Sequence, residues 1–311
     1  MTPHHVVGLG LCVVDHVYLV DALEAGATRI RYGQRLVSAG GHIGTALRQV
    51  AALGCRARVL SALGDDAEGR IVRRSLRDAG VGTKGLLASS RLRTTVAVVL
   101  VDRRNGERRF VVPERRGLEE AAPAFDLSPI DARAILLVDA HFPKQALRAA
   151  RRARAVGARV VADFHRLNAS ARRLLPYVDH AIVSDEIVKA AGFASPRAAL
   201  TWLAEHSRDR PVLTQGARGG LWLDGKRFRR FAPHRVRVVD TTGAGDVFHG
   251  AFVAGLAFGL EFGACLDLGA RAAAGNCTAL GGAALLMTRD ELPSLARRPA
   301  AAVARRARRG R

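Results

Sequence analysis

The sequence predicts an α/β fold of three layers, in which helices cover both sides of a mainly parallel central sheet and a small β-sheet lies apart from it. Apolar runs of strand length alternate with longer helical patterns along most of the 311 residues. This alternation is typical of a parallel sheet with crossover helices. Two segments, 15–37 and 94–112, break the alternation and have the pattern of extended pairs. We expect them to form a small antiparallel sheet.

The strands of the central sheet are expected in short apolar runs bounded by turn residues or charges. These runs cover residues 6–14, 58–63, 134–138, 159–162, 180–183 and 211–214. A further run of branched apolar residues at 236–239 predicts a strand that leads into a late helix.

Helices are expected between these strands because apolar residues recur there at helical spacing. They cover residues 44–53, 68–79, 144–156 and 195–207. In the first of them, Leu47 and Val50 share one face, and Gly54 supplies the helix end.

The chain is long enough for one large domain with a sizeable core, which we expect over residues 1–296. The extended segments 15–37 and 94–112 would form a lid, the second turning at Asn105 and Gly106. Several crossings join this lid to the large domain, as suits an element that closes over a ligand. Residues 297–311 are rich in arginine and low in complexity, which predicts a flexible tail.

Composition argues against a membrane protein and a disulfide framework. Hydrophobic residues make up 49% of the chain, but no run approaches the roughly 18 apolar residues that a membrane span needs. The apolar run at 6–14 has no preceding Lys or Arg and no following cleavage site, so it predicts a buried strand rather than a signal peptide. The four cysteines are far apart and lack metal-ligand spacing. We therefore expect a soluble, cytoplasmic protein with reduced cysteines.

The formal net charge of +21 raises the alternative of a non-catalytic nucleic-acid-binding protein. All but four of the 49 basic residues are arginines, and they are spread over the predicted helices. This spread indicates a compositional bias towards arginine rather than a binding groove. A nucleic-acid partner is therefore not favoured, and deletion of residues 297–311 would test the tail.

The stretch VVDTTGAGDVFHGAF, residues 238–252, carries the clearest chemistry. A helical pattern begins after Thr242, so Gly243, Ala244 and Gly245 fall in a first helical turn. The N–H groups of such a turn are unpaired, and small residues let an anion approach them. Asp246 follows within the same turn, where a carboxylate can accept a proton beside a bound anion. This combination predicts phosphoryl transfer to a hydroxyl.

An acidic residue in a first helical turn can instead serve only to stabilise the helix. A capping box would place that acid three residues after Thr242, at the position of Gly245. Asp246 is the fourth residue, so the spacing favours catalysis over capping.

The stretch resembles the second signature of the ribokinase-like carbohydrate kinases, the PfkB family, which reads D-T-x-G-A-G-D. Three more segments resemble family motifs in the right order: GGHIGT at 40–45, GDDAEG at 64–69 and TQGARG at 214–219. Together the resemblance covers about residues 6–292, so chance is a weak explanation. It implies a ribokinase-like fold with a β-sheet lid, ATP and Mg²⁺ as cofactors, and a homodimer formed through the lid.

The resemblance also implies residue roles. Asp246 would be the base, and the N–H groups of Gly243, Ala244 and Gly245 would hold the transferring phosphoryl oxygens. Residues implied to bind the nucleotide are Ser184, Thr214, Gly216, Gly219 and Asn276. The resemblance implies that Asp240 helps to bind a monovalent cation, usually K⁺ in the family, and an Asx turn is an equal alternative. The family's N-x-x-E metal motif is replaced here by Ser184-Asp185-Glu186, a departure from the family, and Glu186 is the candidate for water-mediated Mg²⁺ binding.

For the acceptor, the resemblance implies a small sugar held by Asp15 and by backbone groups at Gly40 and Gly41. Further candidates are Arg29 as an anion clamp, Thr45 where many members have Asn, and His141 at a strand end, where a structural histidine is the alternative. Paired glycines before a helix can also be simple turn chemistry. Sulfofructose kinases are the most similar subgroup, but Val112 cannot hydrogen-bond a sulfonate.

Two rival enzyme classes remain. A nucleoside kinase has the same fold, but the expected lid offers only Tyr18, Tyr32 and Phe110 for stacking on a base, which favours a sugar. A nicotinamide-dependent oxidoreductase is suggested by Gly8 and Gly10, but the third glycine of that fingerprint is absent.

Overall fold

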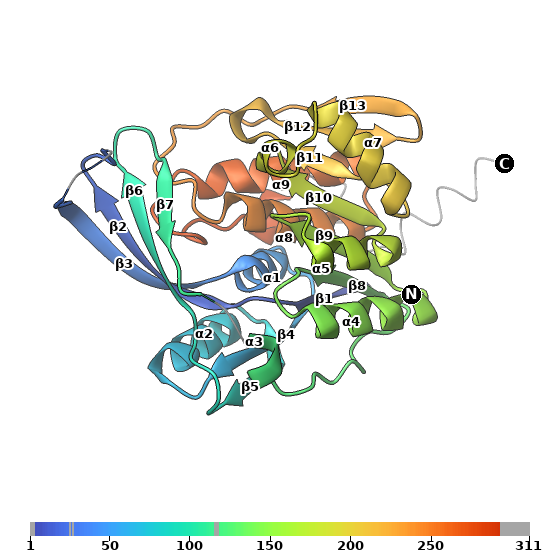
Figure 1. The fold of residues 1–311 in the computed structure, drawn as a ribbon, viewed down its shortest axis with the longest axis horizontal. Coiled ribbons are helices and arrows are strands. Elements are labelled where there is room, and N and C mark those ends of the chain that lie inside the picture. The colour runs from blue at the N-terminus through green and yellow to red at the C-terminus, as the bar shows by residue number, and fades with distance from the viewer. Residues whose placement is uncertain (1–3, 25, 27, 115–117, 293–311) are drawn as a thin grey trace.

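The computed structural model describes residues 4–24, 26, 28–114 and 118–292, so the tail expected at 297–311 lies outside it. Within these residues the larger sheet has nine strands. Their spatial order is β13 (Arg227–Phe231), β12 (Gly220–Asp224), β11 (Val212–Thr214), β10 (His180–Ser184), β9 (Arg159–Phe164), β8 (Ala134–Val138), β1 (His5–Leu9), β4 (Ala57–Gly64) and β5 (Gly82–Ser89). Figure 1 shows this sheet at the centre of the molecule.

The larger sheet is parallel from β5 to β11, and β12 and β13 extend it as antiparallel strands. The carboxyl ends of the parallel strands therefore meet at one edge, where open α/β sheets bind ligands. This confirms the predicted α/β fold class and locates the edge at which a site is expected.

Helices cover both faces of the larger sheet. Alternate residues of a strand point to opposite faces, and in β8 Leu137 joins one buried cluster whereas Leu136 joins the other. The first face carries α1 (His42–Ala52), α2 (Ala67–Asp78), α8 (Ala244–Ala257) and α9 (Phe262–Asn276). The second face carries α3 (Leu118–Ala121), α4 (Pro143–Val156), α5 (Ala169–Leu174), α6 (Glu186–Ala190) and α7 (Pro196–His206).

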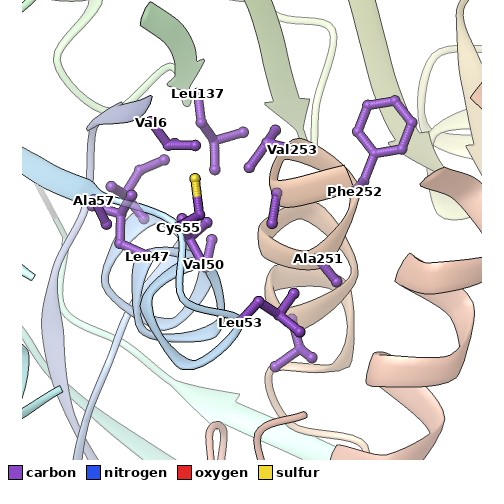
Figure 2. Close-up of a cluster of buried hydrophobic side chains, with 14 of the residues drawn as sticks. Val6, Leu47, Val50, Leu53, Cys55, Ala57, Leu137, Ala251, Phe252 and Val253 are labelled. Carbon is purple, nitrogen blue, oxygen red and sulfur yellow. The ribbon is translucent and has the colours of Figure 1, made fainter. Parts of the chain in front are cut away.

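The first face is held together by apolar side chains between α1, α8 and the strands (Figure 2). Leu47 and Val50 of α1 are fully buried, as are Val253 of α8 and Leu137 of β8. Burying such side chains contributes about 1.5–3 kcal/mol each. The packing fixes the first turns of α1 and α8 relative to each other.

The smaller sheet has the order β3 (Tyr32–Gly40), β2 (Val13–Val20), β6 (Val96–Asp102) and β7 (Arg108–Val111). It lies beside the larger sheet, on the left of Figure 1. The expected antiparallel pairing is present between β2 and β3 and between β6 and β7, but the central pair, β2 and β6, is parallel.

The predicted strand at 6–14 is divided between the two sheets. β1 ends at Leu9 and β2 begins at Val13. Between them, a Cβ atom at Gly10 would overlap the carboxylate of Asp139, and Leu11 N donates to Asp139 Oδ2 at 2.8 Å. A carboxylate far away in the sequence thus turns the chain from one sheet into the other.

The prediction of a strand at residues 236–239 was wrong. This described stretch has no regular structure, and Val238 is 42% exposed. Val239 N donates to Cys277 O at 2.8 Å, so its hydrogen bond goes to the end of α9 rather than to a sheet. The edge strand of the larger sheet is β13, formed by the preceding segment.

The four predicted helices are present as α1, α2, α4 and α7, within two residues of the expected bounds. Ser195 Oγ accepts a hydrogen bond from Ala198 N at 3.1 Å and so caps α7. All four cysteines are buried and free, as predicted. Across the described part of the chain, every helix is too short or too polar to cross a membrane.

Candidate active site

The residues predicted to form an anion hole lie at the start of α8. Gly243 precedes the helix with φ of 69°, a left-handed conformation that suits glycine. A Cβ atom there would also overlap Gly282 O, whereas a Cβ atom at Gly245 would meet nothing within 4 Å. Ala244 N closes a turn on Thr241 O at 3.3 Å. The N–H of Gly245 has no carbonyl one turn earlier in the helix, and it forms part of the positive end of the helix dipole.

The loop before α8 is fixed by buried polar side chains. Asp240 is fully buried, and its Oδ1 accepts from Thr242 N at 2.8 Å while Oδ2 accepts from Gly281 N at 2.9 Å. The first of these bonds is the Asx turn that the sequence left as an alternative. Asn276 is also fully buried, and its Nδ2 donates to Thr242 O at 3.1 Å. These contacts set the position of the glycine turn.

The predicted acceptor residues lie beside this loop. Asp15 of β2 is 6% exposed and pairs in register with Ser38, two residues before Gly40. A Cβ atom at Gly40 would overlap the Asp15 carboxylate, and one at Gly282 would lie 3.6 Å from Asp15 Oδ2. Because Gly282 O also meets Gly243, the structure brings Asp15, Gly40 and the glycine turn together.

Gly41 connects this group to α1. It precedes the helix with φ of 86°, and a Cβ atom would lie 2.7 Å from Leu11 O. Thr45 is buried in the first turn of α1, where its N–H bonds Gly41 O at 2.9 Å. The conformation and the close approach both account for glycine at position 41.

A cluster of histidines and carboxylates, which sequence reasoning missed, lies between α1, β9 and α8. His42 Nδ1 lies 3.2 Å from Asp246 Oδ1 and 2.8 Å from His165 Nε2. His165 Nε2 lies 3.5 Å from Asp163 Oδ1, and His249 Nε2 lies 3.6 Å from the same oxygen. The only local signals were His42 directly after the paired glycines and His249 three residues after Asp246.

Asp139 and His141 extend this cluster. The buried Asp139 accepts from Leu11 N at 2.8 Å and from His141 N at 2.9 Å. His141 Nδ1 lies 3.2 Å from Asp139 Oδ1, and its ring stacks on that of His42 at 5.1 Å between centroids. His141 thus reaches the predicted site and also has the structural contacts of the alternative interpretation.

Burial and nearby charges shift the pKa values of this region. Burial alone would lower the pKa of His42, but the carboxylates of Asp246 and Asp163 outweigh it and raise the pKa to about 9. For Asp15, burial and the negative charges of Asp246 and Asp240 raise the pKa to about 7, against an opposing effect of His42. His42 is therefore cationic at neutral pH, whereas Asp15 changes between its protonated and ionised forms near that pH.

The predicted nucleotide residues lie at the carboxyl ends of β10 and β11. Ser184 and Thr214 are register partners, and the buried Ser184 Oγ has no hydrogen-bond partner among the described residues. Gly216 and Gly219 have φ of 54° and 78°, so both need glycine. Glu186 is exposed at the start of α6. Its free-standing carboxylate suits a Mg²⁺ ion that keeps its waters.

Two residues considered for an anionic substituent lie outside this group. Arg29 is exposed on the loop that joins β2 to β3, at the opposite end of their ladder from Asp15. Val112 follows β7 and is 48% exposed. An exposed valine beyond the lid strand supplies no hydrogen bond to a substrate.

The hairpin between β6 and β7 contacts the loop that leads into α8. Arg108 Nη1 donates to Thr241 Oγ1 at 2.6 Å, and Thr241 Oγ1 donates to Gly106 O at 3.0 Å. Residues of the hairpin and Thr241 also line a cavity of about 230 Å³. The smaller sheet therefore reaches over the edge at which the site lies.

Comparison with known proteins decides the family. Residues 3–289 match the sequence model of the pfkB family carbohydrate kinases. The chain belongs to this family. The kinase is 30% identical over 237 residues to the aminoimidazole riboside kinase of Salmonella typhimurium, covering 70% of the chain and 72% of that enzyme.

Solved structures agree on the fold of the kinase. A proposed ribokinase of Agrobacterium tumefaciens is 27% identical, with a TM-score of 0.84 over 99% of this chain and 100% of that one. The ribokinase of Arabidopsis thaliana, solved with ribose and ATP, is 21% identical, with a TM-score of 0.79 over 96% and 100% of the two chains. The kinase therefore has the ribokinase-like fold and is an ATP-dependent carbohydrate kinase. The sulfofructose kinase subgroup stays a prediction.

Proposed function

We propose that the kinase transfers the γ-phosphoryl group of ATP to a hydroxyl of a small sugar or sugar derivative, with Asp246 as the base. The observation that carries this proposal is the meeting of Asp246 and the glycine turn of α8 with Asp15 and Gly40. The glycine turn and Asp246 offer an anion site and a base. Asp15 and Gly40 offer a carboxylate and a backbone that a substrate can approach closely. Their juxtaposition is what transfer between a phosphate and a hydroxyl requires.

Acceptor binding is assigned to the end of the smaller sheet. The Asp15 carboxylate would hydrogen-bond a sugar hydroxyl, and Gly40 and Gly41 would let backbone groups approach the sugar closely. Thr45 supports this corner from within α1. His141 would reach the acceptor beside His42, whereas the position of Arg29 supports no contact with it.

In the reaction, the acceptor hydroxyl would give its proton to Asp246 as its oxygen forms a bond to the γ-phosphorus. The bond from that phosphorus to the bridging oxygen breaks, and ADP leaves with the electron pair. The N–H groups at the start of α8, from Gly243 to Gly245, would stabilise the charge on the equatorial oxygens. His42, 3.2 Å from Asp246, would keep that carboxylate oriented.

The nucleotide is assigned to the ends of β10 and β11, where Ser184, Thr214, Gly216 and Gly219 meet. The buried Ser184 hydroxyl without a partner supports this assignment. Asn276 would act through its hold on the glycine turn rather than by touching the nucleotide. Mg²⁺, when bound, would neutralise the phosphates, and Glu186 is the residue proposed to hold it through water.

Three further properties are proposed with this function. Asp240 keeps a second lone pair on each carboxylate oxygen, which would serve K⁺ together with carbonyls near Gly281. A homodimer through the smaller sheet is supported by its exposed Phe110 and Val111. The cytoplasm, which supplies ATP, is the proposed location.

A nucleoside is the second candidate for the acceptor, because the Salmonella typhimurium relative acts on a riboside. Family membership favours either acceptor over the non-catalytic nucleic-acid-binding alternative. ADP formation, coupled to an optical assay, should be measured with a panel of aldoses, ketoses and ribosides. Turnover with a free sugar and not with a riboside supports the proposal, and the reverse order supports a nucleoside kinase. No turnover with any member overturns the acceptor class proposed.

A further inference from the structure

Four side chains in the candidate site place possible metal-ligand atoms close together. His42, Asp163, His165 and Asp246 each offer a nitrogen or oxygen atom, and these atoms all lie within 4.8 Å of one another. The four residues come from the start of α1, from β9, from the turn after β9 and from the first turn of α8. Because these elements are fixed by core packing, the four atoms form a preorganised group.

The separations between these atoms fit a small divalent ion. A four-coordinate ion with ligands at about 2.0–2.1 Å keeps neighbouring ligand atoms about 3.4 Å apart. His42 Nδ1 lies 3.2 Å from Asp246 Oδ1. The Asp163 carboxylate lies 3.8 Å from His42 Nδ1 through Oδ2 and 3.5 Å from His165 Nε2 through Oδ1, so either of its oxygens is near a histidine ligand. The two histidine nitrogens are 2.8 Å apart and need to separate by about 0.6 Å to reach that spacing.

His249 of α8 packs against this group and fixes one of its carboxylates. The residue is 6% exposed, and its Nδ1 lies 2.6 Å from Gly245 O, a contact that requires the proton on Nδ1. Nε2 has no hydrogen-bond partner among the described residues and lies 3.6 Å from Asp163 Oδ1. The ring is therefore held with its second nitrogen beside the Asp163 carboxylate, which limits the positions that this carboxylate can take.

We propose that His42, Asp163, His165 and Asp246 form a binding site for a divalent transition-metal ion such as Zn²⁺, with His249 supporting Asp163. Imidazole nitrogens suit Zn²⁺ and its neighbours in the first transition row, whereas Mg²⁺ takes oxygen ligands. The site is therefore distinct in chemistry and in residues from the one proposed for Mg²⁺ at Glu186.

The consequence for the enzyme rests on the proposed function. With Asp246 bound to a metal ion, its carboxylate lone pairs are occupied, and it cannot accept the proton of the acceptor hydroxyl. Zn²⁺ would then inhibit phosphoryl transfer, and excess Mg²⁺ would not relieve the inhibition. The metal site would thus couple the activity of the kinase to the supply of free transition-metal ions.

Metal binding is tested on the full chain, stripped with a chelator and studied without ATP or sugar. Co²⁺ should produce visible ligand-field absorption that saturates at one ion per chain, and Zn²⁺ should abolish it. Competition with a chromophoric chelator should give a Zn²⁺ dissociation constant of about 10 μM or tighter. Absence of saturable absorption, or a dissociation constant weaker than about 1 mM, overturns the site.

Variants localise the site. His165→Gln should weaken Zn²⁺ binding by at least about tenfold, because one ligand is lost. Its side chain is about half exposed, so the fold should tolerate the change, and circular dichroism verifies this. His42→Gln should weaken binding to a similar extent, and His234→Gln, at an exposed pair with Asp267, is the matched control. Unchanged affinity in both site variants overturns the assignment.

The two proposals fail separately. A kinase that turns over sugar but binds no Zn²⁺ refutes the metal site and leaves the proposed function standing. Saturable Zn²⁺ binding that is lost in His165→Gln supports the metal site whether or not an acceptor has been found. If Zn²⁺ binds at this site and turnover continues unchanged with the metal bound, the role of Asp246 as the base is refuted.

Discussion

His42 Nδ1 lies 3.2 Å from Asp246 Oδ1, although the two residues are 204 positions apart in the chain. The first turns of α1 and α8 bring them together, and the packing between these helices holds the contact. Burial lowers the pKa of His42, but the carboxylates of Asp246 and Asp163 have the larger combined effect and raise it to about 9. A cationic imidazole thus orients the proposed base before any substrate is present.

Asp246→Asn should lower kcat by about 10²–10⁴-fold, because the proton acceptor is lost while the glycine turn remains. The affinity for ATP, measured by calorimetry, should change less than about threefold. Turnover comes from the coupled ADP assay with the best acceptor. Asp267→Asn, at an exposed carboxylate of α9, is the control and should keep wild-type turnover. A kcat within tenfold of the wild type would refute the role of Asp246.

Gly243→Ala should lower the stability of the fold, whereas Gly245→Ala should lower catalytic efficiency and leave stability unchanged. Gly243 has a left-handed φ and meets Gly282 O, so alanine there should lower Tm by about 2–6 °C. A Cβ atom at Gly245 meets no protein atom, so Tm should stay within about 1 °C. The added methyl should nevertheless reduce kcat/KM for ATP at least about tenfold by narrowing the anion hole. Thermal unfolding and initial rates distinguish the two, and equal losses of Tm would contradict the prediction.

Asp15→Asn should stabilise the unliganded kinase more at pH 8 than at pH 5. The folded-state pKa of Asp15 is raised to about 7 by burial and by Asp246 and Asp240. Between the unfolded pKa of about 4 and that value, the folded state binds more protons, so the wild type loses unfolding free energy as pH rises. The gain of the variant at pH 8 should be on the order of 1–3 kcal/mol. Denaturant unfolding of both proteins at pH 5, 6.5 and 8 measures the gain in unfolding free energy. A gain that becomes smaller as pH rises would contradict the prediction.

His180 should make the wild type less stable in acid. It is 3% exposed, and burial together with Arg159 lowers its pKa to about 4, against the charge of Asp179. Its contribution to the unfolding free energy is complete above pH 6.5 and is lost as pH falls towards 4. Over that range the wild type should lose on the order of 2–3 kcal/mol relative to His180→Gln. Denaturant titrations of the wild type and His180→Gln at pH 6.5 and pH 4 measure this loss, with His234→Gln as an exposed control. An equal loss of unfolding free energy in the wild type and His180→Gln would contradict the prediction.

Much of the fold was predictable because its signals are local. The four expected helices carry apolar residues at helical spacing and end signals such as Gly54, and the inner parallel strands are continuous apolar runs. The division of residues 6–14 between two sheets was not predictable, because it depends on Asp139, which is remote in the sequence. Residues 236–239 have strand composition, but their hydrogen bonds go to the end of α9. Composition does not specify the partner of a strand.

The candidate site was predictable where a motif is contiguous and not where it is assembled. The glycine turn and Asp246 lie within a few residues of each other, so the sequence alone predicts an anion site beside a carboxylate. His42, Asp163 and His165 lie on separate elements, and only the order of the strands brings them within reach of one another. A single histidine in each segment has no signature of its own.

The smaller sheet is attached to the larger domain through the residues proposed to hold the acceptor. Three residues separate β1 from β2, and Gly41 alone separates β3 from α1. A hinge at these joints would lie among the residues proposed to bind the acceptor. Any rotation of the smaller sheet would therefore change the contacts with the sugar. A substitution at these joints would then change both the choice of acceptor and the rate at which the smaller sheet closes. Evolution could not alter one of these properties without altering the other.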